Sequence, residues 1–270
     1  MPELPEVETV ASGLRRTLVG RRIVTVTVRE RRLRRPIPHD LAALVSGRAV
    51  TSVSRHGKLL RLALDDDGLE LVMHLGMSGT VRVQDDSGGL RRHDHVMMAL
   101  DDGRAVIFHD PRRFGLITVR AAGGAAAEPL GVDPVNGGFT ADLLGAVTRG
   151  RRRPIKNLLM DQSLIAGLGN IYANEILAVA GVRPGRASGR LSRGQREAIV
   201  AATRDVLDAA IRRGGSSISD FHDASGRQGA FQTRFLVYDR EGEPCRRCET
   251  SIRRRVLGGR STYYCPRCQR

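Results

Sequence analysis

Four cysteines near the end of the chain have the spacing of a metal site. They form the pattern C-x2-C-x16-C-x2-C, at Cys245, Cys248, Cys265 and Cys268, and no other cysteine is present. Each close pair can present two thiolates from one tight turn, and the intervening run is long enough for a β-hairpin. Two disulfides are the alternative, but they need an oxidising compartment, and the first residues lack the pattern of a secretion signal. The spacing therefore predicts one structural Zn2+ ion with four cysteine ligands.

The run between the two cysteine pairs, RRRVLGGRSTYY, is strongly basic. It carries Arg253, Arg254, Arg255 and Arg260. Because four thiolates leave no open coordination position, the metal is expected to hold this hairpin rather than to catalyse. A basic hairpin fixed by zinc is typical of nucleic-acid binding.

Lysine is rare in this arginine-rich chain and is confined to Lys58 and Lys156. An ammonium group can lose its proton and act as a point charge, whereas a guanidinium stays charged and planar. The two lysines are therefore candidates for chemistry or phosphate contact, with chance retention as the alternative.

Histidine gives a weaker signal. His93 and His95 can face one side of a strand, but no third ligand lies at a suitable spacing for a second metal site. We interpret His56, His74 and His109 as hydrogen-bonded polar residues near a working surface.

The charge balance favours a polyanionic partner. Lysine and arginine number 44 against 29 acidic residues, which gives a formal net charge of +15 at pH 7. Such an excess binds phosphates and releases counterions, although a basic structural protein, such as a ribosomal one, has the same balance. No apolar run approaches the length of about 18 residues that a membrane span needs, so we expect no membrane association and a cytoplasmic, nucleoid-associated protein.

The elements that must position these residues change along the chain. Residues 1–20 have the three- and four-residue apolar spacing of a helix, and residues 22–120 contain short β-like runs separated by turn clusters. The runs are IVTVTV, LLRLAL, LELVMHL, HVMMAL and AVIFH. After a linker at 121–134 the pattern becomes helical, with Ser192 and Gln195 forming a capping-box signal for a helix that runs to Arg213. Residues 216–230 are polar and contain glycine, which predicts a long loop.

Five segments in order give the chain a family resemblance. PELPEVE at the start, HLGMSG at 74–79, DPRRFG at 110–115, IAGLGNIYANE at 165–175 and the zinc module together resemble the formamidopyrimidine-DNA glycosylase (Fpg/Nei) family. The resemblance extends from Pro2 to Gln269 and implies an α+β fold. Its parts are an N-terminal antiparallel β-sandwich with a leading helix at 1–131, a helix–two-turn–helix DNA-binding domain at 135–232, and a zinc-finger β-hairpin at 235–270.

The resemblance implies a nucleophile at the N-terminus. Once Met1 is removed, Pro2 presents a secondary amine, and an α-amine with a pKa of about 8 is neutral at pH 7 far more often than a lysine. Glu3 resembles the general acid at the sugar, and Glu6 a supporting acid. Lys58 resembles the lysine that assists β-elimination and contacts phosphate, and Arg260 the finger arginine that grips phosphates and assists δ-elimination.

The resemblance also implies residues that bind DNA and fill the gap left by an extruded nucleotide. Met77, Arg112 and Phe114 match the three void-filling positions, although core packing is the ordinary role of a Met or Phe. IAGLGNIYANE is interpreted as helix, turn and helix, with Asn170 opening the second helix. The remaining predicted DNA contacts are His93, Arg113, Arg151 and Lys156.

The predicted lesion is an oxidised purine. PELPE is similar to the formamidopyrimidine-type start rather than the PEGPE of the endonuclease VIII branch, and a lesion-capping loop would contain Ile218, Ser219, Asp220 and Phe221. Two residues depart from the family pattern: Ser219 stands where an arginine is frequent, and Asp239 replaces a more usual glycine.

We therefore predict a monomeric, bifunctional glycosylase and lyase acting on double-stranded DNA with 8-oxoguanine, formamidopyrimidines or abasic sites. An enzyme for oxidised pyrimidines is the alternative within the class. A non-catalytic, zinc-dependent DNA-binding protein is the alternative outside it, and the presence of Pro2, Glu3, Lys58 and Arg260 argues against that reading.

Overall fold

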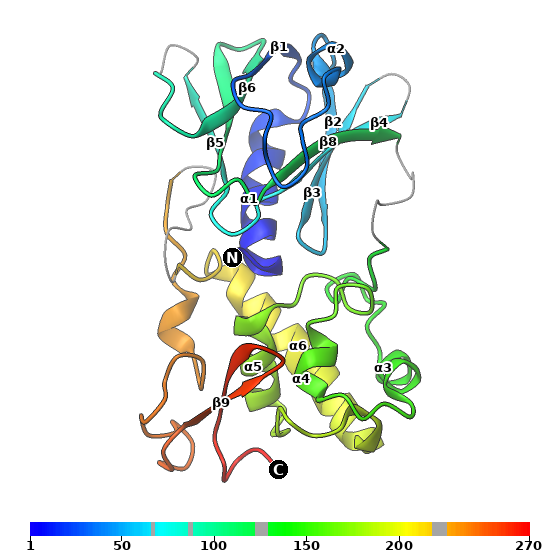
Figure 1. The fold of residues 1–270 in the computed structure, drawn as a ribbon, viewed down its shortest axis with the longest axis vertical. Helices are drawn as coiled ribbons and strands as arrows, with labels where there is room; N and C mark the ends of the chain where they lie inside the picture. The colour runs from blue at the N-terminus through cyan, green and yellow to red at the C-terminus, as the bar shows by residue number, and fades with distance from the viewer. Residues whose placement is uncertain (66–67, 86–88, 122–128, 218–225) are drawn as a thin grey trace. The chain divides into compact units, whose positions relative to one another are not determined.

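The computed structural model describes residues 1–65, 68–85, 89–121, 129–217 and 226–270, and these residues form two compact units (Figure 1). Unit 1 comprises Met1–Ala125 and Arg213–Ala230, and unit 2 comprises Ala126–Arg212 and Phe231–Arg270. Unit 1 contains antiparallel sheets, whereas unit 2 contains helices and a β-hairpin beside the four cysteines. The predicted α+β class is therefore confirmed.

Unit 1 is built from two four-stranded antiparallel sheets. The first has the order β1-β6-β7-β5 and the second the order β2-β3-β4-β8. The strands of the first sheet are β1 (Ile23–Val28), β5 (Thr80–Asp85), β6 (Asp94–Leu100) and β7 (Arg104–His109). Those of the second are β2 (Val50–His56), β3 (Leu59–Leu64), β4 (Leu69–His74) and β8 (Leu116–Ala121).

Three of these strands were not predicted from the sequence. They are β2, β5 and β8, and each lies at an edge of its sheet. An edge strand is partly in water and tolerates polar residues, which dilute the alternating apolar pattern. The short helix α2 (Leu41–Val45) was also missed, because five residues are too few to show a helical period.

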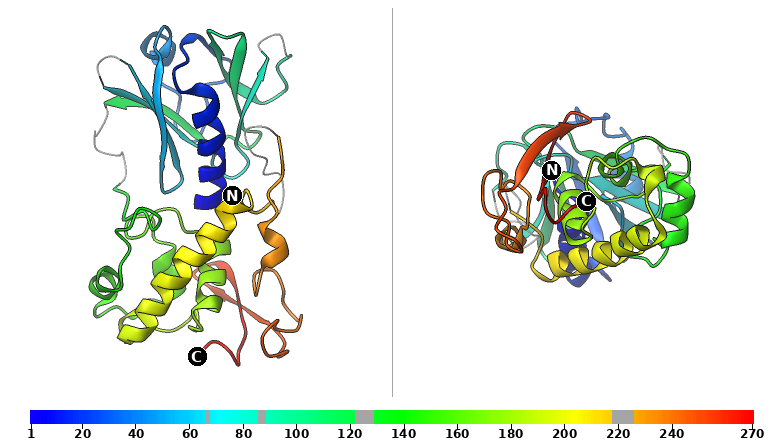
Figure 2. Two further views of the ribbon diagram at one scale, coloured as in Figure 1. Left: turned by 180° about the vertical axis from the view of Figure 1, so that it is seen from behind. Right: turned by 90° about the horizontal axis from the view of Figure 1, so that it is seen from below.

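Helix α1 (Leu4–Leu18) packs against both sheets. Its residues Val7, Val10, Leu14 and Leu18 are buried in one core cluster with apolar residues of all eight strands or their flanks. In the view from behind, α1 runs in front of the two sheets (Figure 2). Burial of this apolar stripe, at roughly 25 cal/mol per Å2, fixes the helix that carries the predicted catalytic N-terminus.

Two turns of unit 1 pass from one sheet to the other. The first joins β4 to β5 through residues 75–79, and the second joins β7 to β8 through residues 110–115. Because β4 pairs with β8 and β5 pairs with β7, the two turns are neighbours. Together the two turns contain all residues of the HLGMSG and DPRRFG segments except His74, which ends β4.

Unit 2 is a helical assembly with a hairpin. Its elements are α3 (Ala141–Thr148), α4 (Ile155–Leu159), α5 (Asn170–Val179), η1 (Ser188–Arg190), α6 (Arg193–Arg212), η2 (Phe231–Arg234), β9 (Arg253–Leu257) and β10 (Arg260–Tyr264). Helix α5 contacts α4, α6 and β10, so it connects the helices to the hairpin. No helix in the described part of the chain is long and apolar enough to span a membrane.

Two local predictions for unit 2 have different outcomes. The capping box is confirmed, because the Ser192 N–H donates to the Gln195 side chain and the Gln195 N–H donates to Ser192 Oγ, both at 3.2 Å. The interpretation of IAGLGNIYANE as helix, turn and helix is wrong in its first part. Helix α4 ends at Leu159, and Ile165 forms an isolated parallel bridge with Val132. Apolar residues alone do not distinguish a buried bridge from a helix end.

Candidate active site, metal centre and DNA-binding elements

The start of α1 holds the predicted nucleophile and acid in a defined geometry. Pro2 and Glu3 are buried, whereas Met1 is half exposed. The Glu3 N–H donates to the Glu6 carboxylate at 2.8 Å, and the Glu3 carboxylate accepts from the Glu6 N–H. This reciprocal capping box fixes the backbone that directly follows Pro2.

Lys58 lies at the turn between β2 and β3 and is buried. Two bonds from Arg55 position this turn: its Nε donates to Glu8 on α1 at 2.9 Å, and its Nη1 donates to the Gly57 carbonyl at 3.1 Å. The structure therefore attaches the Lys58 turn to the N-terminal half of α1. The link between Arg55 and Glu8 is not predictable from the sequence, because nothing in their local pattern indicates a bond across 47 residues.

Glu6 also holds the base of the predicted lesion-capping loop. Its Oε1 accepts hydrogen bonds from the Ser216 N–H at 2.7 Å and from Ser216 Oγ at 3.0 Å. Gly215 has a positive φ of 79°, and a Cβ there would lie 2.8 Å from the same carboxylate oxygen. Glu6 thus connects α1 to this segment, although Ile218, Ser219, Asp220 and Phe221 lie outside the described residues.

The three predicted void-filling residues lie on the two neighbouring turns of unit 1. Met77 is 40% exposed and Phe114 is 44% exposed. Arg112 is also exposed, and its guanidinium lies 5.0 Å from the centre of the Phe114 ring. These exposures exclude core packing as the role of Met77 and Phe114.

Hydrogen bonds hold the histidines beside these turns. His95 Nε2 lies 2.7 Å from the Asp110 carbonyl, and His109 Nδ1 lies 2.8 Å from the Asp94 carboxylate. Burial alone would raise the pKa of Asp94, but hydrogen bonds from Arg82, the Arg91 N–H and His109 bring that pKa to about 2. Asp94 therefore remains a carboxylate at pH 7, and its bond from the Arg91 N–H at 2.7 Å closes the turn that contains the predicted DNA contact His93.

Two further predicted DNA contacts, His93 and Arg113, lie in unit 1. Burial, followed by the charge of Arg92, lowers the pKa of His93, so its ring is expected to be neutral at pH 7. Arg113 has a positive φ of 57° and forms an ion pair with Glu30 at 3.2 Å.

The four cysteines come together as a metal site. Their Sγ atoms all lie within 4.8 Å of one another, and none is in a disulfide. Among the described residues this is the one group of three or more potential ligands close enough to hold a metal ion. Four thiolates in such a cluster fit tetrahedral Zn2+ and leave no position for substrate, so the site binds one structural zinc ion.

The hairpin of β9 and β10 is fastened to the helices by buried polar groups. Asn174 Oδ1 on α5 accepts from the Tyr263 N–H at 2.8 Å. Lys156 on α4 is fully buried, and its Nζ donates to the Ser261 carbonyl at 2.9 Å and to Thr262 Oγ1 at 2.8 Å. The predicted direct DNA contact of Lys156 therefore needs correction, because its ammonium lies beneath the hairpin. Arg260, two residues before Thr262, is exposed.

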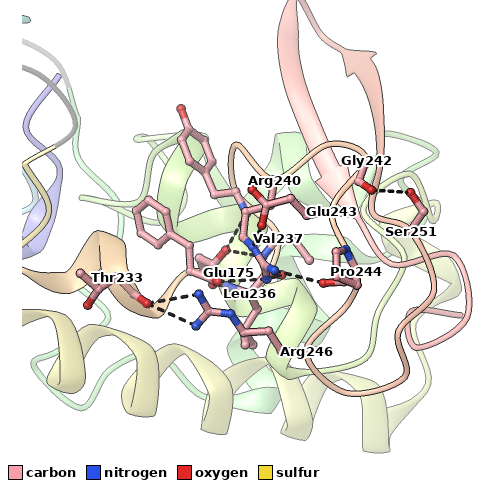
Figure 3. Close-up of polar contacts among 12 residues, drawn as sticks. Glu175, Thr233, Leu236, Val237, Arg240, Gly242, Glu243, Pro244, Arg246 and Ser251 are labelled. Carbon is pink, nitrogen blue, oxygen red and sulfur yellow. Dashed lines mark hydrogen bonds and ion pairs between the residues drawn. The ribbon is translucent and has the colours of Figure 1, made fainter.

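Glu175 is a further buried anchor, and no local sequence pattern indicates its role. Its carboxylate accepts hydrogen bonds from three successive backbone N–H groups, at 2.8 Å from Leu236, 3.0 Å from Val237 and 2.8 Å from Tyr238 (Figure 3). Burial raises the pKa of Glu175, and the three donors act in the opposite direction. The carboxylate thereby connects α5 to the segment that leads into the zinc module.

Replacing Glu175 with Gln is expected to destabilise unit 2 by about 1–3 kcal/mol, since the amide NH2 cannot accept from the buried N–H donors. Thermal unfolding monitored by circular dichroism measures this loss. Glu243→Gln is the matched control, because it removes the same charge from an exposed side chain paired with Arg240, and it should change stability by less than about 0.5 kcal/mol. Equal stability losses for the two variants would contradict the anchoring role.

The other predicted DNA contacts in unit 2 are Asn170, at the start of α5, and Arg151, after α3. Asn170 is the first residue of α5, whose N-terminal end carries a partial positive charge that attracts anions. Arg151 is exposed in the turn after α3.

The chain matches three family profiles in order. These describe the formamidopyrimidine-DNA glycosylase N-terminal domain at residues 1–117, the H2TH domain of the same enzymes at 130–222, and a zinc finger found in FPG and IleRS at 242–270.

Whole-chain comparisons agree with these profiles. The chain is 47% identical over 274 aligned positions to a formamidopyrimidine-DNA glycosylase from Thioalkalivibrio sulfidiphilus, with complete coverage of both chains. It superposes on a complex of a Lactococcus lactis FPG mutant with Fapy-dG-containing DNA, with a TM-score of 0.91, 31% identity and complete coverage of both chains. It also superposes on MutM (FPG) from Thermus thermophilus, with a TM-score of 0.88, 39% identity and coverage of 99% and 98% of the two chains. From these matches and from its zinc site, the chain belongs to the formamidopyrimidine-DNA glycosylase family.

Proposed function

We propose that this chain is a bifunctional DNA glycosylase and AP lyase of base excision repair. The observation that supports this most directly is the capping box of Glu3 and Glu6, which orders the residues directly after Pro2. The attachment of the Lys58 turn to the same helix adds a second candidate catalytic group. A protein that only bound DNA would not need a buried, ordered N-terminus on a helix that is hydrogen-bonded to the neighbourhood of a buried lysine.

The nucleophile is the secondary amine of Pro2 after loss of Met1. Its nitrogen bonds to C1′ of the nucleotide, and the N-glycosidic bond breaks with its electron pair and a proton going to the departing base. Proton transfer to the ring oxygen, for which Glu3 is the candidate carrier, opens the sugar and gives an iminium ion. A tertiary iminium has no nitrogen-bound proton to lose, so it stays cationic and withdraws electrons from C2′.

Strand cleavage follows from that electron sink. Loss of a C2′ proton breaks the C3′–O bond, and loss of a C4′ proton then breaks the C5′–O bond; the two phosphates leave, and water releases Pro2. Lys58 is assigned to proton donation and phosphate contact during the first elimination. Arg260 is assigned to the phosphates flanking the lesion and to the second elimination, where its charge stabilises the departing phosphate.

DNA binding is assigned to exposed and half-buried groups of both units. Met77, Arg112 and Phe114 fill the space left by the extruded nucleotide, which offsets part of the unstacking cost of a few kcal/mol. The DNA backbone is contacted by His93, Arg113, Arg151 and Asn170. Lys156 does not contact DNA and instead holds the β9–β10 hairpin through its bonds to Ser261 and Thr262. The zinc ion, when bound, holds the β9–β10 hairpin. The functional segments proposed are 1–131, 135–232 and 235–270, in a monomer of the cytoplasm or nucleoid.

The substrate class is DNA with an oxidised base, and we propose a preference for the purines 8-oxoguanine and formamidopyrimidine. PELPE supports this branch, and the similar Lactococcus lactis protein was captured with Fapy-dG-containing DNA. Oxidised pyrimidines are the second candidate, since that protein was also captured with DNA containing one.

Single-turnover excision from matched duplexes with 8-oxoguanine or dihydrouracil decides between the two branches. We expect the purine to be excised at least about tenfold faster, which corresponds to about 1.4 kcal/mol of transition-state discrimination. A duplex with unmodified guanine is the control. Faster excision of dihydrouracil would overturn the preference and leave the proposed chemistry intact.

A further inference from the structure

Asp110 is a buried carboxylate that no step of the proposed mechanism uses. It is 0% exposed and is the first residue of the β7–β8 turn, which neighbours the β4–β5 turn of unit 1. Its Oδ1 accepts a hydrogen bond from Ser78 Oγ at 2.9 Å, and its Oδ2 accepts one from the Gly115 N–H at 2.7 Å. Ser78 follows Met77, and Gly115 follows Phe114, so one carboxylate bridges the two residues adjacent to the exposed apolar side chains.

Backbone contacts hold Asp110 itself in place. Its N–H donates to the His93 carbonyl at 3.0 Å. Its carbonyl accepts from His95 Nε2 at 2.7 Å and from the Arg113 N–H at 3.2 Å. The carboxylate therefore bridges the two turns from a position that is fixed relative to the first sheet.

The two turns leave no room to slide past each other. Gly76 has a positive φ of 64°, and a Cβ at this position would lie 2.4 Å from the carbonyl carbon of Phe114. The strands on both sides are in register, with His74 opposite Leu116 and Thr80 opposite His109. The backbones of the two turns are thus in contact, and Asp110 fills the position where both turns offer a donor.

The turns that carry Met77 and Phe114 are held against each other, although both side chains are exposed to water. Exposed apolar side chains gain nothing in the free protein, so a fixed arrangement of the two turns that carry them serves a function when something occupies this surface. A wedge that enters a base stack must present its side chains in the correct relative position before the base leaves. Burial of a carboxylate is costly unless it is hydrogen-bonded, and here the donors from Ser78 and Gly115 offset that cost.

We propose that Asp110 is a positioning residue that joins the Met77 and Phe114 turns into one preorganised wedge. The inference rests on the void-filling role proposed for these two side chains. It assigns Asp110 no contact with DNA: the carboxylate acts through Ser78 and Gly115.

Ser78→Ala tests the proposal with little risk to the fold, because it removes the Oδ1 bond and leaves the Gly115 bond in place. We expect excision from an 8-oxoguanine:C duplex to slow about fivefold, the effect of losing one hydrogen bond. Cleavage of a duplex that already contains an abasic site should stay within about twofold of the wild type, because no base has to be extruded. The fluorescence of 2-aminopurine placed beside the lesion should rise more slowly in the same proportion as excision.

Thr51→Val is the matched control. It removes a side-chain hydroxyl that donates to the Ala63 carbonyl at 3.2 Å, on an exposed residue of β2 away from both turns. Excision and cleavage rates should equal those of the wild type. Asp110→Ala, if it folds by circular dichroism, should show the Ser78→Ala pattern with a larger slowing of excision.

A double-mutant cycle with Met77→Ala/Phe114→Ala identifies the route of the effect. With the wedge side chains removed, adding Ser78→Ala should slow excision by less than about twofold, since the turns then have nothing to position. An undiminished effect in this background would overturn the proposal, as would equal slowing of excision and abasic-site cleavage. If Met77→Ala/Phe114→Ala slows excision while Ser78→Ala does not, the wedge stands and the role of Asp110 is wrong. If the Met77→Ala/Phe114→Ala variant excises the base at the wild-type rate, the void-filling assignment is wrong, and so is the role inferred for Asp110.

Discussion

A chain with any residue ahead of Pro2 is expected to bind lesion-containing DNA and leave it uncut. Acylation of the proline nitrogen converts the amine to an amide, which has no available lone pair and cannot attack C1′. Loss of the nucleophile should lower the single-turnover excision rate by roughly 10³-fold or more. Borohydride reduction of the reacting mixture should trap no protein–DNA adduct, whereas binding, measured by fluorescence anisotropy, should remain within about twofold because the phosphate contacts lie elsewhere.

The matched control is the same molecule after removal of a cleavable N-terminal tag that leaves Pro2 first. Cleavage of the tag should restore both excision and the borohydride adduct, and mass spectrometry of the digested adduct should place the DNA on Pro2. An adduct on Lys58 or Lys156, or excision by the tagged chain at the rate of the untagged one, would contradict the assignment of the nucleophile.

Loss of zinc is expected to have the second large effect, on DNA binding. Cys265→Ser removes one of four ligands, and structural zinc sites depend on the full set for their folding energy. The core around the site is small: Val237, Ile252 and Tyr263 pack with the cysteines themselves. The hairpin should therefore lose its structure, and affinity for a duplex with an abasic-site analogue should fall at least about tenfold, or about 1.4 kcal/mol.

Metal content and rescue make this result specific. Elemental analysis should give one zinc per wild-type chain and none for Cys265→Ser. Chelation of the wild type should reproduce the loss of affinity, and added Zn2+ should reverse it in the wild type alone. Arg260→Ala keeps all four ligands, so it should retain zinc while slowing strand cleavage. Unchanged DNA affinity in a zinc-free chain would remove the finger from the binding surface.

The zinc site and the order of the segments could be predicted from the sequence, because both depend on local spacing. Two thiolates three residues apart lie on one turn whatever surrounds them, and four in this arrangement form a zinc site. The capping box at Ser192 and Gln195 and the apolar stripe of α1 are likewise local features, and the structure contains both. The α+β class was predictable for the same reason.

The edge strands were not predictable from the same patterns. The residues of β5, TVRVQD, include only two apolar side chains, Val81 and Val83, so the alternating pattern is short. It becomes a strand because it pairs with β7, and β6 separates the two in the sequence. The tertiary structure decides such elements because their hydrogen bonds come from distant residues.

The supporting residues of the candidate site also depended on the tertiary structure. Glu175 has no local sign of its role, since its three partners lie about 60 residues away. Lys156 was selected by its rarity, yet its burial beneath the hairpin, bonded to residues more than 100 positions away, gave it a different role. Asp110 lies in a recognised segment, but its bond to Ser78 spans 32 residues. The sequence by itself determined which chemical groups this protein has and which of them share a turn. Only the tertiary structure decided which groups hold the others in place, because a buried hydrogen bond forms wherever folding brings a donor to an acceptor, at any separation along the chain.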